Sequence, residues 1–172
     1  MKTKKQEELV NSYLSQFENE IKPLYQDIIL FLSKLGYNPK KEKQSISFKH
    51  DLHNKQIAKM GINVNKKKGV SPFFSLRFSA CRGYSQRFVD IVSAYILKYP
   101  TRIAGCLDNK CNYCKGESDT HVYTYTFSAG EQKSHCGAYA VVIPNITNDD
   151  MNEIKKLVME EQEYLMKHEA SA

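Results

Sequence analysis

The stretch SISFKHDLHNKQIAKMGINVNKKKGVSPFFSLRFSA, residues 45–80, contains three short segments in which apolar and polar side chains alternate. These segments are residues 45–50, 56–64 and 72–80. Successive side chains of a strand point to opposite faces of a sheet, so this period predicts three strands that each bury one face. The connections between them are polar and rich in lysine, which is typical of an antiparallel meander with one solvated side.

Three helical patterns surround these strands. Apolar residues recur every three or four positions over residues 6–35, and Pro23 within that run predicts a kink or two helices in series. A second helix is expected over residues 85–99, and its inward-facing residues are predicted to be Phe88, Ile91, Val92, Tyr95 and Ile96. A third should begin after Thr147, with Asp150 completing a capping box at its start.

Two further strands are expected near the C-terminal end, at residues 121–127 and 136–143, paired as a hairpin. The sequence therefore predicts an α+β fold: an antiparallel sheet of about five strands, helices packed on one face, and a cysteine knuckle. We expect a single domain over residues 1–172. Its N-terminal part, residues 1–38, would be a helix or helix pair, and the knuckle, residues 104–116, would precede the last hairpin and helix.

Composition and charge narrow the class of protein. The chain is 41% hydrophobic, and no apolar run approaches the roughly 20 residues that a membrane-spanning helix needs. The start, MKTKKQEELV, has no apolar segment of the kind found in secretory signals, so we expect a cytoplasmic protein with reduced thiols. The net charge of +6 is concentrated in residues 1–100, which hold 18 Lys and Arg against 8 Asp and Glu.

Four cysteines have a spacing that suits a metal. Cys106, Cys111 and Cys114 lie within nine residues, and Cys136 follows in the last predicted strand. Zinc prefers a tetrahedron of thiolate or imidazole ligands, and a Cys-x2-Cys turn supplies two sulfurs to one ion. Four sulfurs would leave no open position for a catalytic water, so the sequence predicts a structural zinc.

Other interpretations of these cysteines stay open at this stage. His135 or His121 would serve as a ligand in place of one cysteine. The spacing Cys-x4-Cys-x2-Cys followed by a distant Cys also matches the ligand pattern of plant-type [2Fe–2S] proteins. Reduced thiols or a redox-responsive disulfide are the alternatives that involve no metal.

The fifth cysteine has a different neighbourhood. Cys81 and Arg87 fit the Cys-x5-Arg pattern of the phosphate-binding loop in Cys-dependent phosphatases, between a predicted strand and a predicted helix. Phe88 stands where such loops place a hydroxyl residue, and the strands are predicted to be antiparallel. The alternative is that Cys81 is a small buried apolar residue.

No other catalytic motif stands out in the sequence. There is no Gly-rich phosphate loop and no His-Glu-x-x-His sequence. The carboxylates of the last helix, Glu160, Glu161 and Glu163, are predicted to form a solvated face. We therefore expect a binding role rather than a catalytic one.

The expected binding surface is aromatic and carries one cation. Tyr123 and Tyr125 should share one face of a strand, and Arg77 on a neighbouring strand would add a positive charge for a planar ligand. The competing interpretation packs these tyrosines under a helix. The partner is predicted to be an unidentified small molecule or protein. Nucleic acid is the alternative, contacted by Arg77 and Lys66–Lys68.

Overall fold

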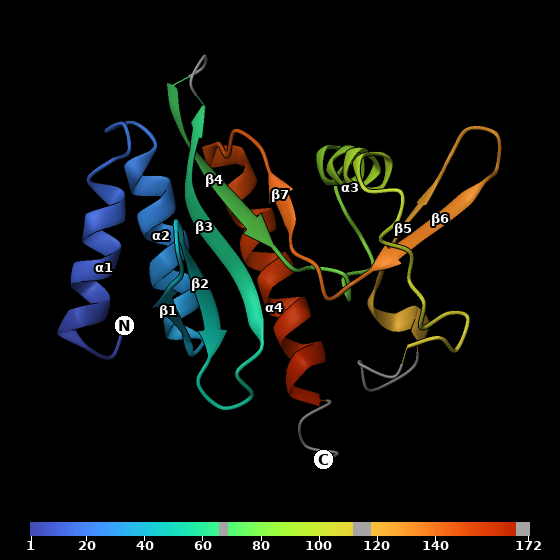
Figure 1. Ribbon diagram of the computed structural model, residues 1–172, viewed down its shortest axis with the longest axis horizontal. Helices are drawn as coiled ribbons and strands as arrows, with labels where there is room; N and C mark the ends of the chain where they lie inside the picture. The colour runs from blue at the N-terminus through green and yellow to red at the C-terminus, as the bar shows by residue number, and fades with distance from the viewer. Residues whose placement is uncertain (66–68, 112–117, 168–172) are drawn as a thin grey trace.

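A computed structural model describes residues 1–65, 69–111 and 118–167 (Figure 1). It contains four α-helices and seven strands among these residues. The helices are α1 (Lys4–Leu14), α2 (Lys22–Lys34), α3 (Gln86–Lys98) and α4 (Met151–Lys167). The strands are β1 (Tyr37–Lys41), β2 (Ser45–His50), β3 (Gln56–Asn65), β4 (Gly69–Leu76), β5 (Val122–Thr126), β6 (Gln132–Cys136) and β7 (Val141–Ile143).

The main sheet has five antiparallel strands in the order β1-β2-β3-β4-β7. The predicted α+β class and five-stranded antiparallel sheet are therefore confirmed. The three alternating segments of residues 45–80 form its middle, as β2, β3 and β4. The cysteine knuckle is not shown, because residues 112–117 of the expected 104–116 segment lie outside the described residues.

One strand of this sheet was not predicted. β1 follows Gly36 and pairs with β2, with Pro39 opposite Phe48. A proline has no N–H for a second neighbour, so it is tolerated in an edge strand. β1 is at the edge of the sheet, which explains how a segment that reads as a turn in the sequence becomes a strand.

The predicted C-terminal hairpin is wrong in its second strand. β5 pairs with β6, not with residues 136–143, and these two strands form a separate sheet. Within the expected strand, residues 136–143, only Val141–Ile143 form a strand of the main sheet, β7, which pairs with β4. The chain changes sheets at Gly137, where its backbone passes so close to the His121 carbonyl and Ser79 that a Cβ atom would overlap both.

The N-terminal run forms two helices in series, which was one of the two predicted outcomes. Pro23 stands in the first turn of α2, where its missing N–H costs nothing. α1 begins with a capping box in which Thr3 and Gln6 satisfy each other's backbone N–H groups. Phe17 and Tyr25 pack edge to face across the connection, with ring centroids 4.8 Å apart.

The other helices occupy two places. α4 lies beside α2 behind the main sheet, whereas α3 lies between β7 and the β5–β6 hairpin (Figure 1). The predicted capping box is confirmed: Thr147 and Asp150 bond reciprocally in a short 3-10 turn, Asn148–Asp150, that leads into α4. Asp150 also binds Arg87 of α3, so this cap joins the two helices.

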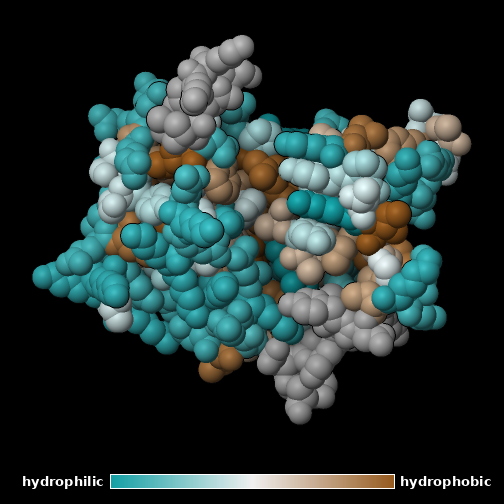
Figure 2. All heavy atoms as spheres, viewed as in Figure 1, coloured by the Kyte–Doolittle hydropathy of each residue, from teal (hydrophilic) through white to brown (hydrophobic). Residues whose placement is uncertain are grey.

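One buried apolar cluster runs through these layers, from α1 across the main sheet to α3, α4 and Tyr123 of the hairpin. Most of the surface seen in Figure 2 is hydrophilic, and the hydrophobic residues exposed on it lie in small groups. No helix within the described parts of the chain combines the length and apolar character that a bilayer crossing requires.

Candidate functional site

The predicted zinc centre does not form among the described residues. Within residues 1–65, 69–111 and 118–167, no group of three or more His, Cys, Asp or Glu side chains is placed to hold a metal ion. Cys111 is exposed and Cys136 ends β6, while Cys114 lies outside the described residues. Our prediction of a zinc-stabilised module is therefore wrong, and the same geometry removes the support for an iron–sulfur cluster.

Backbone hydrogen bonds, rather than a metal ion, connect the segment after α3 to the β5–β6 hairpin. The segment after α3 is tied to β6 by the Ala104 N–H, which donates to the Ser134 carbonyl, and by the Cys136 N–H, which donates to the Arg102 carbonyl. The turn after it closes with the Lys110 N–H on the Gly105 carbonyl, 2.8 Å away. These bonds fix the segment to the hairpin through the main chain. No disulfide joins the cysteines that the structure describes.

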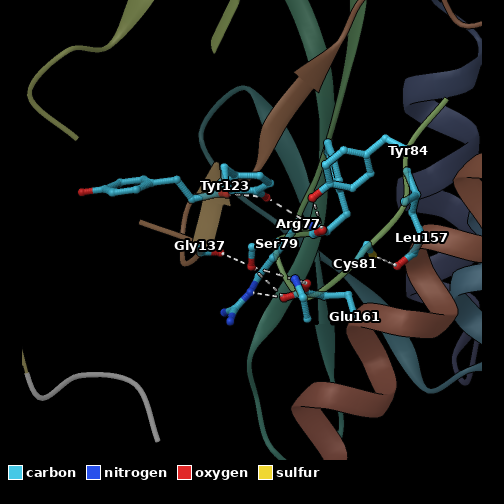
Figure 3. Close-up of polar contacts among 11 residues, drawn as sticks. Arg77, Ser79, Cys81, Tyr84, Tyr123, Gly137, Leu157 and Glu161 are labelled. Carbon is cyan, nitrogen blue, oxygen red and sulfur yellow. Dashed lines mark hydrogen bonds and ion pairs between the residues drawn. The ribbon is translucent and has the colours of Figure 1, made fainter. Parts of the chain in front are cut away.

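Arg77 and Glu161 meet in the interior. Glu161, which we predicted to be solvated, is fully buried and accepts hydrogen bonds from the Arg77 guanidinium and the Ala80 N–H (Figure 3). Burial raises the pKa of Glu161, and the Arg77 charge opposes that shift. Ser79 lies within hydrogen-bond distance of the same carboxylate and donates to the Gly137 carbonyl, so the network links β4, α4 and the β6–β7 connection.

The two predicted ligand tyrosines have different surroundings. Tyr123 is fully buried: its hydroxyl accepts from the Phe78 N–H and donates to the Tyr139 carbonyl. Tyr125 is half-buried and packs edge to face against Phe127, with ring centroids 4.9 Å apart. Arg77 and Tyr123 are thus both turned into the protein, and only Tyr125 retains substantial exposure.

Cys81 has the environment of a buried thiol. It is 6% exposed, and its Sγ lies 3.4 Å from the Leu157 carbonyl oxygen of α4 (Figure 3). Burial, followed by the Glu161 and Glu160 charges, raises the pKa of the Cys81 thiol far above its ordinary value. Arg87 of the same motif binds Asp150 instead. The phosphatase interpretation needs a low-pKa thiolate, and this environment disfavours one.

The basic surface proposed for nucleic acid is not assembled in the described residues. Lys66–Lys68 lie outside them, and Arg77 is committed to Glu161. Lys59 on β3 pairs with Glu42, with Nζ 2.6 Å from Oε2. Of the contacts named for nucleic acid, Arg77 is therefore paired inside the protein, and Lys66–Lys68 are outside the described residues.

A groove of about 610 Å³ runs between α3 and β7, and we call it the α3–β7 groove. Ile91, Ala94, Val142 and Pro144 supply its apolar surface. Val142 is 51% exposed, because side chains alternate along β7 and those of Val141 and Ile143 face the core. The remaining lining residues are Arg87, Asp90, Tyr95, Lys98 and Tyr99.

The two ends of the groove differ in charge. At one end the Arg87 guanidinium is occupied by the Asp150 carboxylate and the Pro144 carbonyl. At the other end, Lys98 lies near the Tyr99 ring, with Nζ 5.4 Å from its centroid. Neither Lys98 nor Arg102 forms an ion pair with a carboxylate among the described residues. Asp90, which accepts a hydrogen bond from Gln86, adds a carboxylate to the lining, so the positive charge of the groove is confined to its Tyr99 end.

Arg102 is not part of the groove lining, but it lies against the ring of Tyr99, which is. Its guanidinium carbon is 3.9 Å from the centroid of Tyr99 and 4.5 Å from that of Tyr139. The faces of these tyrosines attract the guanidinium, and an arginine carries five N–H donors that suit a carboxylate or phosphate. Tyr139 is 46% exposed, and its carbonyl is fixed by the buried Tyr123 hydroxyl. Tyr123, one of our predicted ligand residues, thus supports this cluster from within.

The sequence contained a partial signal for this site. Tyr95 and Tyr99 are spaced by four residues, as neighbours on one helical face are, and Arg102 follows just after the end of the predicted helix. We read Tyr95 only as a core residue of the predicted helix, and we did not single out Arg102. Tyr139 and Val142 come from a segment about forty residues away, and only the packing of β7 beside α3 brings them there.

Comparisons with protein-family models, with curated proteins and with solved structures found no match for this chain. The site is therefore interpreted from its own geometry and chemistry.

Proposed function

We propose that this protein binds a flat, anionic aromatic molecule in the α3–β7 groove. The observation that carries the proposal is the Arg102 guanidinium, which lies over the rings of Tyr99 and Tyr139 and forms no ion pair with a carboxylate in the described residues, beside an apolar groove. An aromatic body would lie on Ile91, Ala94 and Val142. Its carboxylate or phosphate would accept hydrogen bonds from Arg102.

The size and lining of the groove support a small molecule. Ligand sites usually enclose about 300–1,000 Å³, with apolar walls and a few placed polar groups, and the groove has both properties. Guanidinium groups pair with carboxylates and phosphates through two parallel hydrogen bonds, which gives direction as well as attraction. This proposal keeps the chemistry that we expected for the ligand, a planar molecule near a cation. It places the site on other residues and involves no metal.

Binding of 1-naphthoate tests the proposal, with the neutral 1-naphthalenemethanol as the matched control. Isothermal titration calorimetry should give a Kd for 1-naphthoate about tenfold lower than that for the alcohol, a difference of about 1.4 kcal/mol. Arg102→Gln should remove this preference for the anion. Arg82→Gln, which changes an exposed arginine away from the groove, should preserve it.

A second variant tests the place of binding. Ala94→Trp puts a large ring on the groove surface, where Ala94 is exposed, and should abolish binding of both probes without disturbing the core. Equal binding of both probes to the natural protein, or unchanged binding in Arg102→Gln and Ala94→Trp, would refute the proposed function.

A further inference from the structure

The charged residues that α3 contributes to the α3–β7 groove follow one face of the helix. Asp90, Ala94 and Lys98 are spaced by four residues, so they lie one above another along α3, and all three are exposed. The axis of an α-helix advances by about 1.5 Å per residue, which places Asp90 and Lys98 about 12 Å apart along α3. A carboxylate and an ammonium group therefore stand at opposite ends of the groove, with the small side chain of Ala94 between them.

The carboxylate of Asp90 has room for a cation from outside the protein. Its Oδ1 accepts a hydrogen bond from the Gln86 amide, 2.8 Å away, and a carboxylate offers about four acceptor positions. Asp90 forms no ion pair with a lysine or arginine that the structure describes. Arg87, the cation in the same part of the lining, is bound to Asp150 and to the Pro144 carbonyl. Its charge is therefore already countered.

The opposite end of the groove carries the reverse charge. Lys98 is part of the lining there, and the Arg102 guanidinium lies over the ring of Tyr99. Under the function proposed above, this end holds the anionic group of the ligand. The rest of such a ligand lies on Ala94 and Val142, and its far end then reaches the Asp90 carboxylate.

We propose that the ligand of the α3–β7 groove is zwitterionic: it carries an amine at the end opposite its anionic group, and Asp90 selects for that amine. This inference rests on the proposed function, because the anion beside Arg102 sets the orientation of the ligand. The amine is protonated near pH 7 and would donate a hydrogen bond to the Asp90 carboxylate. Two linked benzene rings suit the separation of about 12 Å along the helix.

Isothermal titration calorimetry of the full chain with 4'-(aminomethyl)biphenyl-4-carboxylate tests this inference. The matched probe is 4'-ethylbiphenyl-4-carboxylate, which has a methyl group in place of the ammonium group. Asp90→Asn should weaken binding of the amine probe about three- to fivefold, the range expected for an ion pair that is partly exposed to solvent. Binding of the ethyl probe should not change, which also shows that the variant is folded.

Two further variants separate the possible outcomes. Asp119→Asn makes the same change at an exposed position outside the groove lining and should alter neither probe. Arg102→Gln should weaken both probes, because both carry the carboxylate. If both probes bind and depend on Arg102, but Asp90→Asn affects them equally or not at all, this inference is overturned and the proposed function stands. If neither probe binds, or if Arg102→Gln changes neither, both proposals fail.

Discussion

Nε of Arg77 lies 2.5 Å from Oε1 of Glu161, and both side chains are buried. Arg77 follows the end of β4, and Glu161 is on α4, so the pair fixes the last helix to the main sheet (Figure 3). Burial of an ion pair costs free energy because both charges lose their hydration. Removal of one partner then leaves the other charge buried without its counter-charge.

Glu161→Gln should lower the free energy of unfolding by about 3–5 kcal/mol, because Arg77 keeps its charge and loses the carboxylate. Urea denaturation monitored by circular dichroism measures this loss. Glu163→Gln is the matched control: it makes the same change on the same helix at an exposed position, and it should alter stability by no more than about 0.5 kcal/mol. A loss below about 1 kcal/mol in Glu161→Gln would contradict the structural role given to the pair.

Tyr123→Phe should lower stability by about 1–3 kcal/mol, because it deletes a hydroxyl that serves both the Phe78 N–H and the Tyr139 carbonyl. It should also weaken binding of 1-naphthoate, since Tyr139 loses its support beside Arg102. Tyr125→Phe removes the hydroxyl of a half-buried tyrosine two residues away and should leave both properties nearly unchanged. Equal effects of the two variants in urea denaturation and calorimetry would argue against this role of Tyr123.

Gly137→Ala should destabilise the protein by about 1–3 kcal/mol or more, because the added Cβ would overlap the His121 carbonyl oxygen and Ser79. Thermal unfolding gives the comparison with Gly83→Ala, where a Cβ meets no atom within 4 Å. We expect Gly83→Ala to be neutral within about 0.5 kcal/mol. Similar melting temperatures for the two variants would show that the chain does not cross between sheets as closely as described.

Cys81 should resist alkylation in the folded protein, because its thiol is buried and its pKa is raised by burial. With iodoacetamide at pH 8, we expect Cys111, which is exposed, to be modified at least tenfold faster than Cys81. Peptide mass spectrometry follows each site, and the two rates should converge in 6 M guanidinium chloride. Faster modification of Cys81 than of Cys111 in the folded state would restore the reactive-thiol interpretation.

Local sequence determined much of the secondary structure. The alternation in residues 45–80 predicted β2, β3 and β4, and the Thr147–Asp150 pattern predicted the cap before α4. These predictions succeed because side-chain period and capping depend on neighbours within a few residues. The edge strand β1 was missed because Pro39 reads as a turn residue until its place at the sheet edge is known.

The zinc prediction was wrong because it rested on cysteine spacing alone. A Cys-x2-Cys pattern states how far apart ligands are along the chain, and a metal site requires them to converge in space. The described cysteines do not converge with other ligands into such a group. Main-chain bonds between residues 102–104 and 134–136 supply the connection between these segments instead.

The sequence by itself therefore determined the α+β class, most of the helices and strands, and which side chains of α3 face the core, because each depends on local period and burial. Tertiary structure alone decided that Glu161 is buried against Arg77, that residues 136–143 divide between two sheets, and that Tyr139 meets Arg102. These relationships join surfaces far apart in the chain, and only the packing of complete elements determines which surfaces meet.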